Sequence, residues 1–528
     1  MKKQSLAAIA FLNLIATPVL LQAQEADIKA FDQKYINWYN ADVKEDKKLG
    51  TSVTKTYREL LAGKTPKKTV VVAVIDGGVD IYHEDLKGKI WVNSKEIPGN
   101  NIDDDNNGYV DDVYGWNFIG NSKGENIIFE NLEYTRIYRA GLKEESYTQA
   151  SKVYEKELAQ RKKNLNNIIK FEEKYKSSLK VVNEYFEINV TGKKDLEKLT
   201  SEDADVQAAI TFLKQRYAEG FTEAGLARAK SRNEEFIDKY LNVEYDARKV
   251  IGDNPFDITD TRYGNPDVKG PRATHGTCVA GIIAANRSNG IGIDGIATDV
   301  KIMAIRITPD GDERDKDVAL AIRYAVENGA DIINMSFGKA FSPQKNFVDD
   351  AVKFAESRNV LLIHASGNDG NNIDIEPNFP DGYYADKTEA TNYLEIGASA
   401  MNKGKFAPAI FSNYGKKNVD IFAPGVDIVS LDTNNTYNKS NGTSFAAPVV
   451  AGIAALMLSY YPDLTPKQII DIILASGNNI GKQKVLQPGL TGAERKKVRF
   501  NTLSKTGAVI NAYNAMKMAE NYNRKAKL

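Results

Sequence analysis

Short runs of apolar, β-branched residues recur along the chain, each with the pattern of a strand buried on both faces. The first run, 69–75, is continuously apolar and ends in Asp76-Gly77-Gly78; the others are 301–307, 332–335, 360–365, 394–398 and 419–423. Parallel strands that helices cover on both sides have this continuous pattern, whereas half-exposed strands alternate. Helical stretches at 318–329, 346–358 and 444–461 alternate with these runs. The pattern predicts one α/β domain with a mostly parallel sheet.

The pattern changes between residues 134 and 251, where long charged helices replace the strands. Apolar residues follow a heptad-like stripe: Tyr154, Leu158, Leu165, Ile168, Tyr175, Leu179, Val182 and Phe186. Further helical tracts are expected at 204–217 and 222–240. We interpret 134–251 as a helical insertion that packs on itself, because short helices need tertiary packing to persist. An elongated coil that binds a partner is the alternative.

The N-terminus has the parts of a secretory signal peptide. Lys2 and Lys3 precede an apolar stretch at 6–21, and Gln22-Ala23-Gln24 follows, with the small residue Ala23 at the expected cleavage site. We predict a signal peptide at 1–23 and an exported protein, periplasmic or extracellular, with no stable membrane insertion after cleavage. Asn13 and Pro18 interrupt the stretch, which makes an uncleaved anchor the weaker interpretation.

The remaining boundaries follow from these segments. Residues 24–68 form a polar and aromatic N-terminal extension with helical patches around 31–39 and 57–61. The sheet domain comprises 69–133 and 252–520, and 521–528 is a C-terminal tail.

Composition excludes several function classes. The 528 residues are 42% hydrophobic and 27% charged, and 70 basic residues balance 70 acidic ones. A net charge of zero removes the electrostatic basis for binding nucleic acid. One cysteine and three histidines exclude an intramolecular disulfide and histidine-rich metal sites.

Three segments carry residues suited to nucleophilic catalysis: 74–80, with Asp76; 275–281, beginning His275-Gly276-Thr277; and 442–448, Gly442-Thr443-Ser444-Phe445-Ala446-Ala447-Pro448. They resemble the three signature blocks of subtilisin-like serine proteases, the subtilases. The resemblance covers roughly 69–120 and 265–518. It implies a three-layer subtilisin-like domain with a mostly parallel sheet, and a serine endopeptidase that acts on protein or peptide substrates.

The chemistry of these residues agrees with that resemblance. A serine hydroxyl is a weak nucleophile, so Ser444 needs an imidazole to accept its proton. His275 in turn needs a carboxylate, Asp76, to fix its tautomer and stabilise the imidazolium. No cofactor is required for catalysis.

The resemblance also implies an oxyanion donor and a substrate-binding wall. Ala365-Ser366-Gly367-Asn368 resembles the oxyanion-hole block, in which Asn368 would donate to the developing oxyanion. Ser336, Phe337 and Gly338 resemble the edge that pairs with substrate backbone, with Ser366 and Gly367 also in the substrate-binding set.

Two departures from the family pattern accompany the resemblance. The Asp76 and His275 blocks are unusually far apart, which the helical insertion explains, and we expect the insertion to govern substrate access. A long N-terminal prodomain is not evident before Thr69.

A catalytically inactive relative that binds a partner through the insertion is the alternative function. A serine esterase is disfavoured because the order Asp, His, Ser and the Gly-Thr-Ser-Phe-Ala sequence do not fit its nucleophile elbow.

Residues 103–112 suggest a structural calcium site. Asp103, Asp105 and Asn107 alternate and Gly108 follows, as at the start of a calcium loop. Tyr114 occupies the position of the closing glutamate, so we assign closure to Asp112 and the carbonyl of Tyr109. An acidic surface turn is the alternative.

The other two histidines and the cysteine are weaker candidates for a role in catalysis. We expect His83 to be structural, and also His364, with pocket lining as the alternative for His364. Cys278 lies three residues after His275, so it is either a thiol near the imidazole or a buried, inert one.

Overall fold

The computed structural model describes residues 27–141, 145–489 and 495–525. The predicted signal peptide at 1–23 lies outside these residues. These described residues divide into two compact units: 27–126, 251–308, 313–489 and 495–525 form the sheet unit, and 127–141, 145–250 and 309–312 form the helical unit.

A nine-stranded sheet, ordered β10-β13-β7-β6-β5-β4-β1-β3-β2, is the centre of the sheet unit. Every strand pair except β10–β13 is parallel. The strands are β1 Val70–Asp76, β2 Gly115–Asn117, β3 Val300–Arg306, β4 Ile332–Met335, β5 Leu361–Ala365, β6 Tyr393–Ser399, β7 Ile421–Pro424, β10 Asn478–Asn479 and β13 Ala508–Val509. Two hairpins, β8 Ile428–Asp432 with β9 Thr436–Ser440 and β11 Lys484–Leu486 with β12 Lys497–Arg499, complete the strands.

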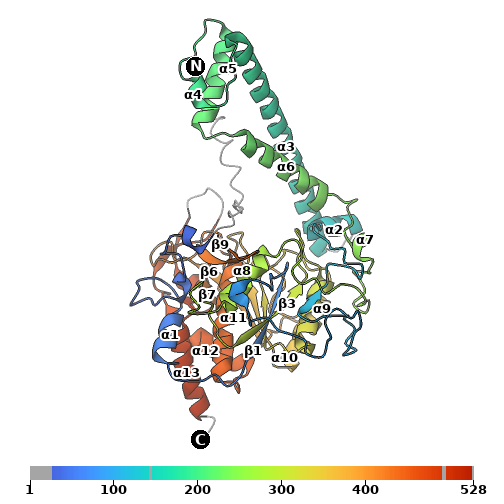
Figure 1. Cartoon of the computed structure of the whole chain (residues 1–528), viewed down its shortest axis with the longest axis vertical. Helices are drawn as coiled ribbons and strands as arrows, with labels where there is room; N and C mark the ends of the chain where they lie inside the picture. The colour runs from blue at the N-terminus through green and yellow to red at the C-terminus, as the bar shows by residue number, and fades with distance from the viewer. Residues whose placement is uncertain (1–26, 142–144, 490–494, 526–528) are drawn as a thin grey trace. The chain divides into compact units, whose positions relative to one another are not determined.

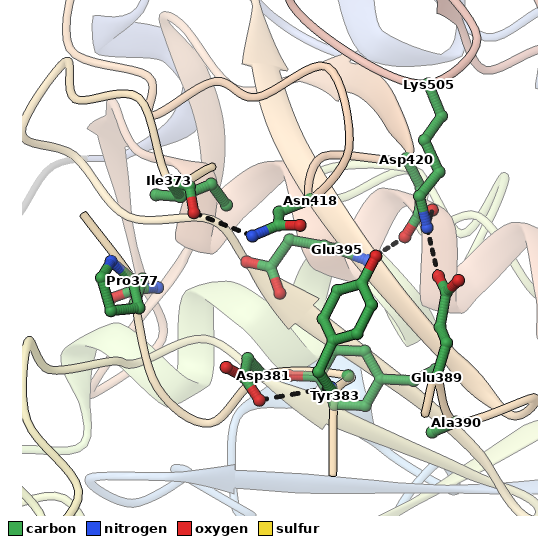
Figure 2. A pocket seen from close by; sticks show the side chains of 13 residues that line it. Ile373, Pro377, Asp381, Tyr383, Glu389, Ala390, Glu395, Asn418, Asp420 and Lys505 are labelled. Atoms are coloured by element: carbon green, nitrogen blue, oxygen red, sulfur yellow. Dashed lines mark hydrogen bonds and ion pairs between the residues drawn. The ribbon is translucent and has the colours of Figure 1, made fainter. Parts of the chain in front are cut away.

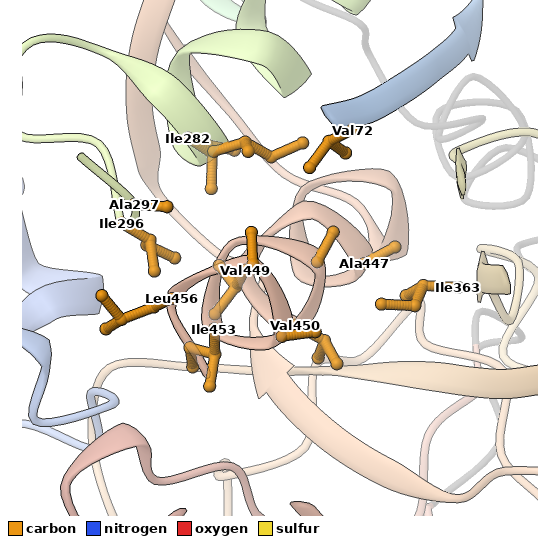
Figure 3. Close-up of a cluster of buried hydrophobic side chains, with 14 of the residues drawn as sticks. Val72, Ile282, Ile296, Ala297, Ile363, Ala447, Val449, Val450, Ile453 and Leu456 are labelled. Atoms are coloured by element: carbon orange, nitrogen blue, oxygen red, sulfur yellow. The ribbon is translucent and has the colours of Figure 1, made fainter. Parts of the chain in front are cut away.

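Helices cover the sheet to give the three-layer α/β architecture (Figure 1). They include α8 Thr274–Ala284, α9 Asp315–Glu327, α10 Lys345–Ser357, α11 Thr443–Tyr460, α12 Pro466–Ser476 and α13 Ala512–Lys525. Helix α11 contacts β1, β4, β5, β6 and β7 and is buried along its length. Its side chains pack between strand residues such as Val72 and Ile363 and the α8 residue Ile282 (Figure 3). This packing places the start of α11, and therefore Ser444, above the carboxyl ends of the central strands.

Helix α11 is also the one described helix that is long and apolar enough to cross a membrane. Within the structure, 94% of this apolar window is buried, so the helix forms the core of the sheet unit.

Residues 27–68 are part of the sheet unit, although little of the helix expected around 31–39 is present. Only short 3₁₀ turns, Ile28–Ala30 and Trp38–Asn40, occur there, and α1 spans Val53–Glu59. Asn37 has φ 55°, a left-handed conformation that interrupts a right-handed helix. Trp38 and Tyr39 are buried in the main hydrophobic core, which explains the irregular path: the chain turns to insert these two rings.

The helical unit contains α2 Glu133–Ala140, α3 Glu145–Phe186, α4 Lys193–Leu196, α5 Ala204–Ala218 and α6 Glu223–Glu235. Helix α3 contacts α2, α5 and α6. The apolar stripe of α3 contributes Tyr175 and Val182 to a core that also holds Ile210 and Leu213 of α5. The insertion therefore packs on itself, as its sequence favours.

Candidate active site

Asp76 and His275 meet at the carboxyl end of β1. The His275 Nδ1–H lies 2.9 Å from both carboxylate oxygens of Asp76. Gly276 makes this approach possible, because a Cβ at that position would lie 2.2 Å from the Gly78 carbonyl oxygen. The Asp76 side chain is buried. The His275 side chain is 41% solvent-exposed, so a substrate can reach it.

The charge of Asp76 controls the basicity of His275. Burial by itself lowers the pKa of the imidazole, but the adjacent Asp76 carboxylate more than offsets this, and the pKa of His275 is raised above its ordinary value. Because the Nδ1–H donates to Asp76, the neutral ring has its Nε2 lone pair available to accept a proton.

Ser444 lies in the first turn of α11, beside His275. The ring of Phe445, the next residue, is 5.4 Å from the His275 ring between centroids. The Ser336 hydroxyl donates to the Ser444 carbonyl at 2.8 Å and holds the backbone of this turn. Among the described residues, no hydrogen bond joins the Ser444 hydroxyl to His275. Such bonds are often long before substrate binds.

Asn368 is fixed by Thr443, a residue that the sequence did not single out. The Thr443 backbone N–H donates to Asn368 Oδ1 at 2.8 Å, and the Thr443 hydroxyl donates to the same oxygen at 3.0 Å. With its oxygen engaged, the exposed Asn368 side chain is left to donate through Nδ2. Ser444 is the second residue of α11, so no helix residue lies four positions earlier to accept from its N–H.

The expected substrate-binding residues follow the ends of β4 and β5. Gly338 is exposed, Phe337 is buried, and Ser336 is buried with its hydroxyl bonded to Ser444. A Cβ at position 338 would lie 2.8 Å from both amide heteroatoms of Asn378, so any other residue there would displace the end of that side chain.

Ser366, at the end of β5, is bonded to Asn413. The Ser366 hydroxyl donates to the Asn413 carbonyl at 3.3 Å. Asn413 in turn donates to the Ser366 carbonyl at 2.8 Å and accepts from the N–H groups of Asp369 and Asn371. Asn413 therefore clamps the loop that carries Gly367 and Asn368.

The acidic loop gathers a different set of carboxylates from the one expected. Glu96, Asp103 and Asp105 bring one carboxylate oxygen each to within 4.8 Å of one another. Glu96 had no signal in the sequence, because it precedes the loop. Its oxygens accept hydrogen bonds from the backbone of Asp104, Asp105 and Asp111.

Asp112, the expected closing ligand, is engaged by protein groups. Its Oδ1 accepts from Asn93 at 2.9 Å, and its Oδ2 accepts from Asn107 at 3.1 Å and from the Tyr324 hydroxyl at 2.6 Å. The Tyr109 ring lies edge-on to the Tyr324 ring, 4.9 Å away between centroids. Asn107 Oδ1 accepts from the Tyr109 N–H.

The other candidate residues are structural. His83 is buried, its Nδ1 accepts from the Asp85 N–H, and its Nε2–H donates to the Thr436 carbonyl. Cys278 is buried, and its thiol donates to the Leu431 carbonyl at 2.8 Å. Burial raises the pKa of this thiol, so it is the inert alternative that applies.

Known proteins similar to this chain define its class. Residues 67–492 match the sequence profile of the subtilase family, Peptidase_S8. The thermophilic serine proteinase of Bacillus sp. (strain AK1) is 36% identical over 221 residues, which cover 42% of this chain and 49% of that protein. Subtilisin DY of Bacillus licheniformis is 32% identical over 260 residues, which cover 49% of this chain and 88% of that protein. A solved structure, that of the prenylagaramide maturation protease PagA, is 29% identical with a TM-score of 0.38, covering 47% of this chain and 82% of that chain.

The fold and the matched segment thus define a serine-type endopeptidase class with a three-layer α/β domain. The chain belongs to the subtilase family.

Proposed function

We propose that this protein hydrolyses peptide bonds with Ser444 as nucleophile, His275 as general base, Asp76 as the orienting carboxylate and Asn368 as oxyanion donor. The contact between His275 Nδ1 and both Asp76 oxygens at 2.9 Å is the observation that carries the proposal. The two residues come from distant parts of the sequence, and a surface histidine has no structural need for a buried carboxylate.

The proposed reaction proceeds in two displacements. His275 Nε2 accepts the Ser444 proton while Oγ attacks the scissile carbonyl carbon, and Asn368 Nδ2 with the Ser444 N–H stabilises the oxyanion. The imidazolium then gives its proton to the leaving amine as the C–N bond breaks and an acyl-enzyme remains. Water, deprotonated by His275, then attacks the ester carbonyl carbon. The bond from this carbon to Ser444 Oγ breaks, Oγ takes the proton back from the imidazolium, and the carboxylic acid product leaves.

Substitution of the nucleophile and of the oxyanion donor tests this proposal. We expect Ser444→Ala to lower kcat on casein to near background. Asn368→Ala should lower it by about 100–1000-fold, the loss measured for the equivalent donor in a subtilisin. Melting temperatures should remain close to that of the unsubstituted protein. Full activity of Ser444→Ala would disprove the proposal.

We further propose a structural calcium ion bound by Glu96, Asp103 and Asp105. Oxygen ligands from clustered carboxylates suit this hard cation, and a cation would offset their mutual repulsion. The Asn107 and Asp112 side chains, which were expected from the sequence to be ligands, would then support the loop: Asn107 donates to Asp112 and accepts from the Tyr109 N–H. The Tyr109 carbonyl, also expected as a ligand, is left out of the proposed set. The melting temperature should be higher in millimolar calcium than in excess chelator, and this difference should be smaller in Glu96→Gln. An equal rise in Glu96→Gln would contradict the site.

We also propose that the protein is exported to the periplasm or to the outside of the cell. The sequence of residues 1–23 supports it, and the relatives include a cell wall-associated protease of Bacillus subtilis. Fractionation of expressing cells into cytoplasm, periplasm and medium, with processing read by N-terminal sequencing, tests this proposal. An unprocessed cytoplasmic protein would contradict it.

A further inference from the structure

A buried ion pair lies behind the expected substrate-binding edge. His364 on β5 and Glu395 on β6 are register partners, and His364 Nδ1 lies 3.0 Å from both carboxylate oxygens of Glu395. The His364 side chain is fully buried, and the Glu395 side chain is 7% solvent-exposed. Neither side chain belongs to the Asp76, His275 and Ser444 set, and burying such a pair is costly unless its hydrogen bonds are satisfied.

The second nitrogen of the same ring contacts the substrate-binding segment. His364 Nε2 lies 2.6 Å from the carbonyl oxygen of Phe337. The Phe337 carbonyl oxygen can only accept a hydrogen bond, and the same holds for both oxygens of Glu395 when it is a carboxylate. A neutral imidazole carries one N–H and one lone pair, so it would turn a lone pair toward one of these oxygens. With Glu395 ionised, this geometry is satisfied only by a ring that donates from both nitrogens, an imidazolium; with Glu395 protonated, the ring would be neutral and would accept at Nδ1.

His83 provides the opposite arrangement in the same protein. Its Nδ1 accepts from a backbone N–H while its Nε2 donates to a carbonyl, which is the pattern of a neutral ring. The two buried histidines therefore differ in the charge that their partners require, although both are enclosed by the sheet unit.

The charges around His364 favour the cation. Burial alone lowers the pKa of this imidazole, but Glu395, the Phe337 carbonyl and Glu313 offset this, and the pKa of His364 is raised. Tyr393 packs its ring 6.1 Å from that of His364. Figure 2 shows Glu395 in a polar pocket with Asp381, Asp420, Glu389 and Lys505. Lys505 pairs with Asp420 and Glu389, and Lys345 pairs with Asp381, so acidic groups outnumber basic ones there. Burial and the nearby Asp420 and Asp381 also raise the pKa of Glu395, and the His364 cation opposes this rise.

We propose that His364, held as a cation by Glu395, is a positioning residue that fixes the Phe337–Gly338 peptide plane for binding of an extended peptide substrate. The peptide bond is planar, so pinning the Phe337 carbonyl also sets the direction of the Gly338 N–H, which points away from His364. Gly338 is exposed, and its N–H is suited to bond an added substrate strand. This assignment rests on the proposed peptidase function.

The protonation of the ring can be tested without any hydrolysis. The chain has three histidines, so ¹⁵N-histidine labelling gives a small set of NMR signals, assigned with His83→Gln and His364→Gln. We expect both nitrogens of His364 to be protonated at neutral pH, while His83 has one protonated and one bare nitrogen. A bare nitrogen on His364 at neutral pH would overturn the proposal.

The positioning role predicts an effect on long substrates only. His364→Gln and Glu395→Gln should raise KM for a chromogenic tetrapeptide by about tenfold, a difference of about 1.4 kcal/mol. Kinetics on a single-residue ester, which does not reach Gly338, should change little. His83→Gln is the matched control, a buried histidine whose loss should leave the KM ratio of the two substrates unaltered.

The outcomes separate the two proposals. Equal losses on the tetrapeptide and the ester would mean that His364 only supports the fold, and would refute the positioning role. If the unsubstituted protein hydrolyses neither substrate, the peptidase proposal fails, while the NMR result still decides the charge of His364.

Discussion

The Asp76 carboxylate does more than orient His275, because it also sets the pH at which the base is available. The neutral ring is the base, so activity is lost as the pH falls through the pKa of His275. That pKa is raised above 6.5 by Asp76, against the effect of burial. Without the negative charge of Asp76, only the effect of burial on His275 remains, and this effect lowers the pKa of His275.

Asp76→Asn should therefore move the acid limb of kcat/KM to lower pH while kcat falls by about 10⁴-fold, the loss reported for the corresponding change in trypsin. The measurement is the pH profile of tetrapeptide hydrolysis. Asp80→Asn is the control: Asp80 is also buried, but it pairs with Lys269. An acid limb that stays in place in Asp76→Asn, or shifts equally in Asp80→Asn, would contradict this account.

At the scale of elements, the segment 27–61 is tied to the core that supports the active site. The Trp38 indole N–H donates to the Asp427 carbonyl, and the Tyr39 hydroxyl donates to the Asp294 carbonyl. The Thr51 carbonyl accepts from the N–H of Ala512 at the start of α13. These bonds join the segment to elements that are far away in the sequence, so it stabilises the folded unit.

Trp38→Ala should lower the free energy of unfolding by about 3–5 kcal/mol, because it leaves a large cavity in the core. Tyr82→Ala is the control, since the Tyr82 side chain is 74% exposed and its loss should change stability by less than about 0.5 kcal/mol. Denaturant unfolding of both variants gives the comparison. If the two variants were equally stable, 27–61 would not be an integral part of the unit.

The elements that the sequence predicts well are those with a continuous apolar pattern. Strand β4 occurs at 332–335 as expected, and α11 begins within one residue of its expected start. Elements shaped by distant contacts could not be predicted. The turns around Trp38 follow the core that receives this ring, and β9 of the β8–β9 hairpin has mostly polar residues.

In the candidate site too, the sequence predicts residues in short motifs but not the contacts between distant segments. Asp76, His275, Ser444 and Asn368 lie in distinctive short motifs. Thr443 and Asn413 act through contacts with residues far away in the sequence, and Glu96 through contacts with the acidic loop that follows it; the spacing of residues along the chain does not predict these contacts. The His364 and Glu395 pair was missed for this reason, because it forms only when β5 and β6 align.

At the scale of the whole molecule, the helical unit has its own core and contains no residue of the candidate active site. It interrupts the chain between Asp76 and His275. Replacing α3–α6 with a short Gly and Ser linker should leave tetrapeptide hydrolysis nearly intact and change the rate on casein, if the insertion governs access. The measurement is the ratio of kcat/KM for the two substrates in a variant confirmed to be folded. An unchanged ratio would reject a role in access.

The identity of the nucleophile is the central claim, and covalent labelling tests it most directly. A fluorophosphonate should react with the unsubstituted protein at one residue, Ser444, identified by mass mapping of the digested protein. His275→Ala should label far more slowly, because the hydroxyl then lacks its base, and labelling should abolish casein hydrolysis in proportion to its extent. Labelling at another residue, or full activity in protein labelled completely at Ser444, would contradict the account.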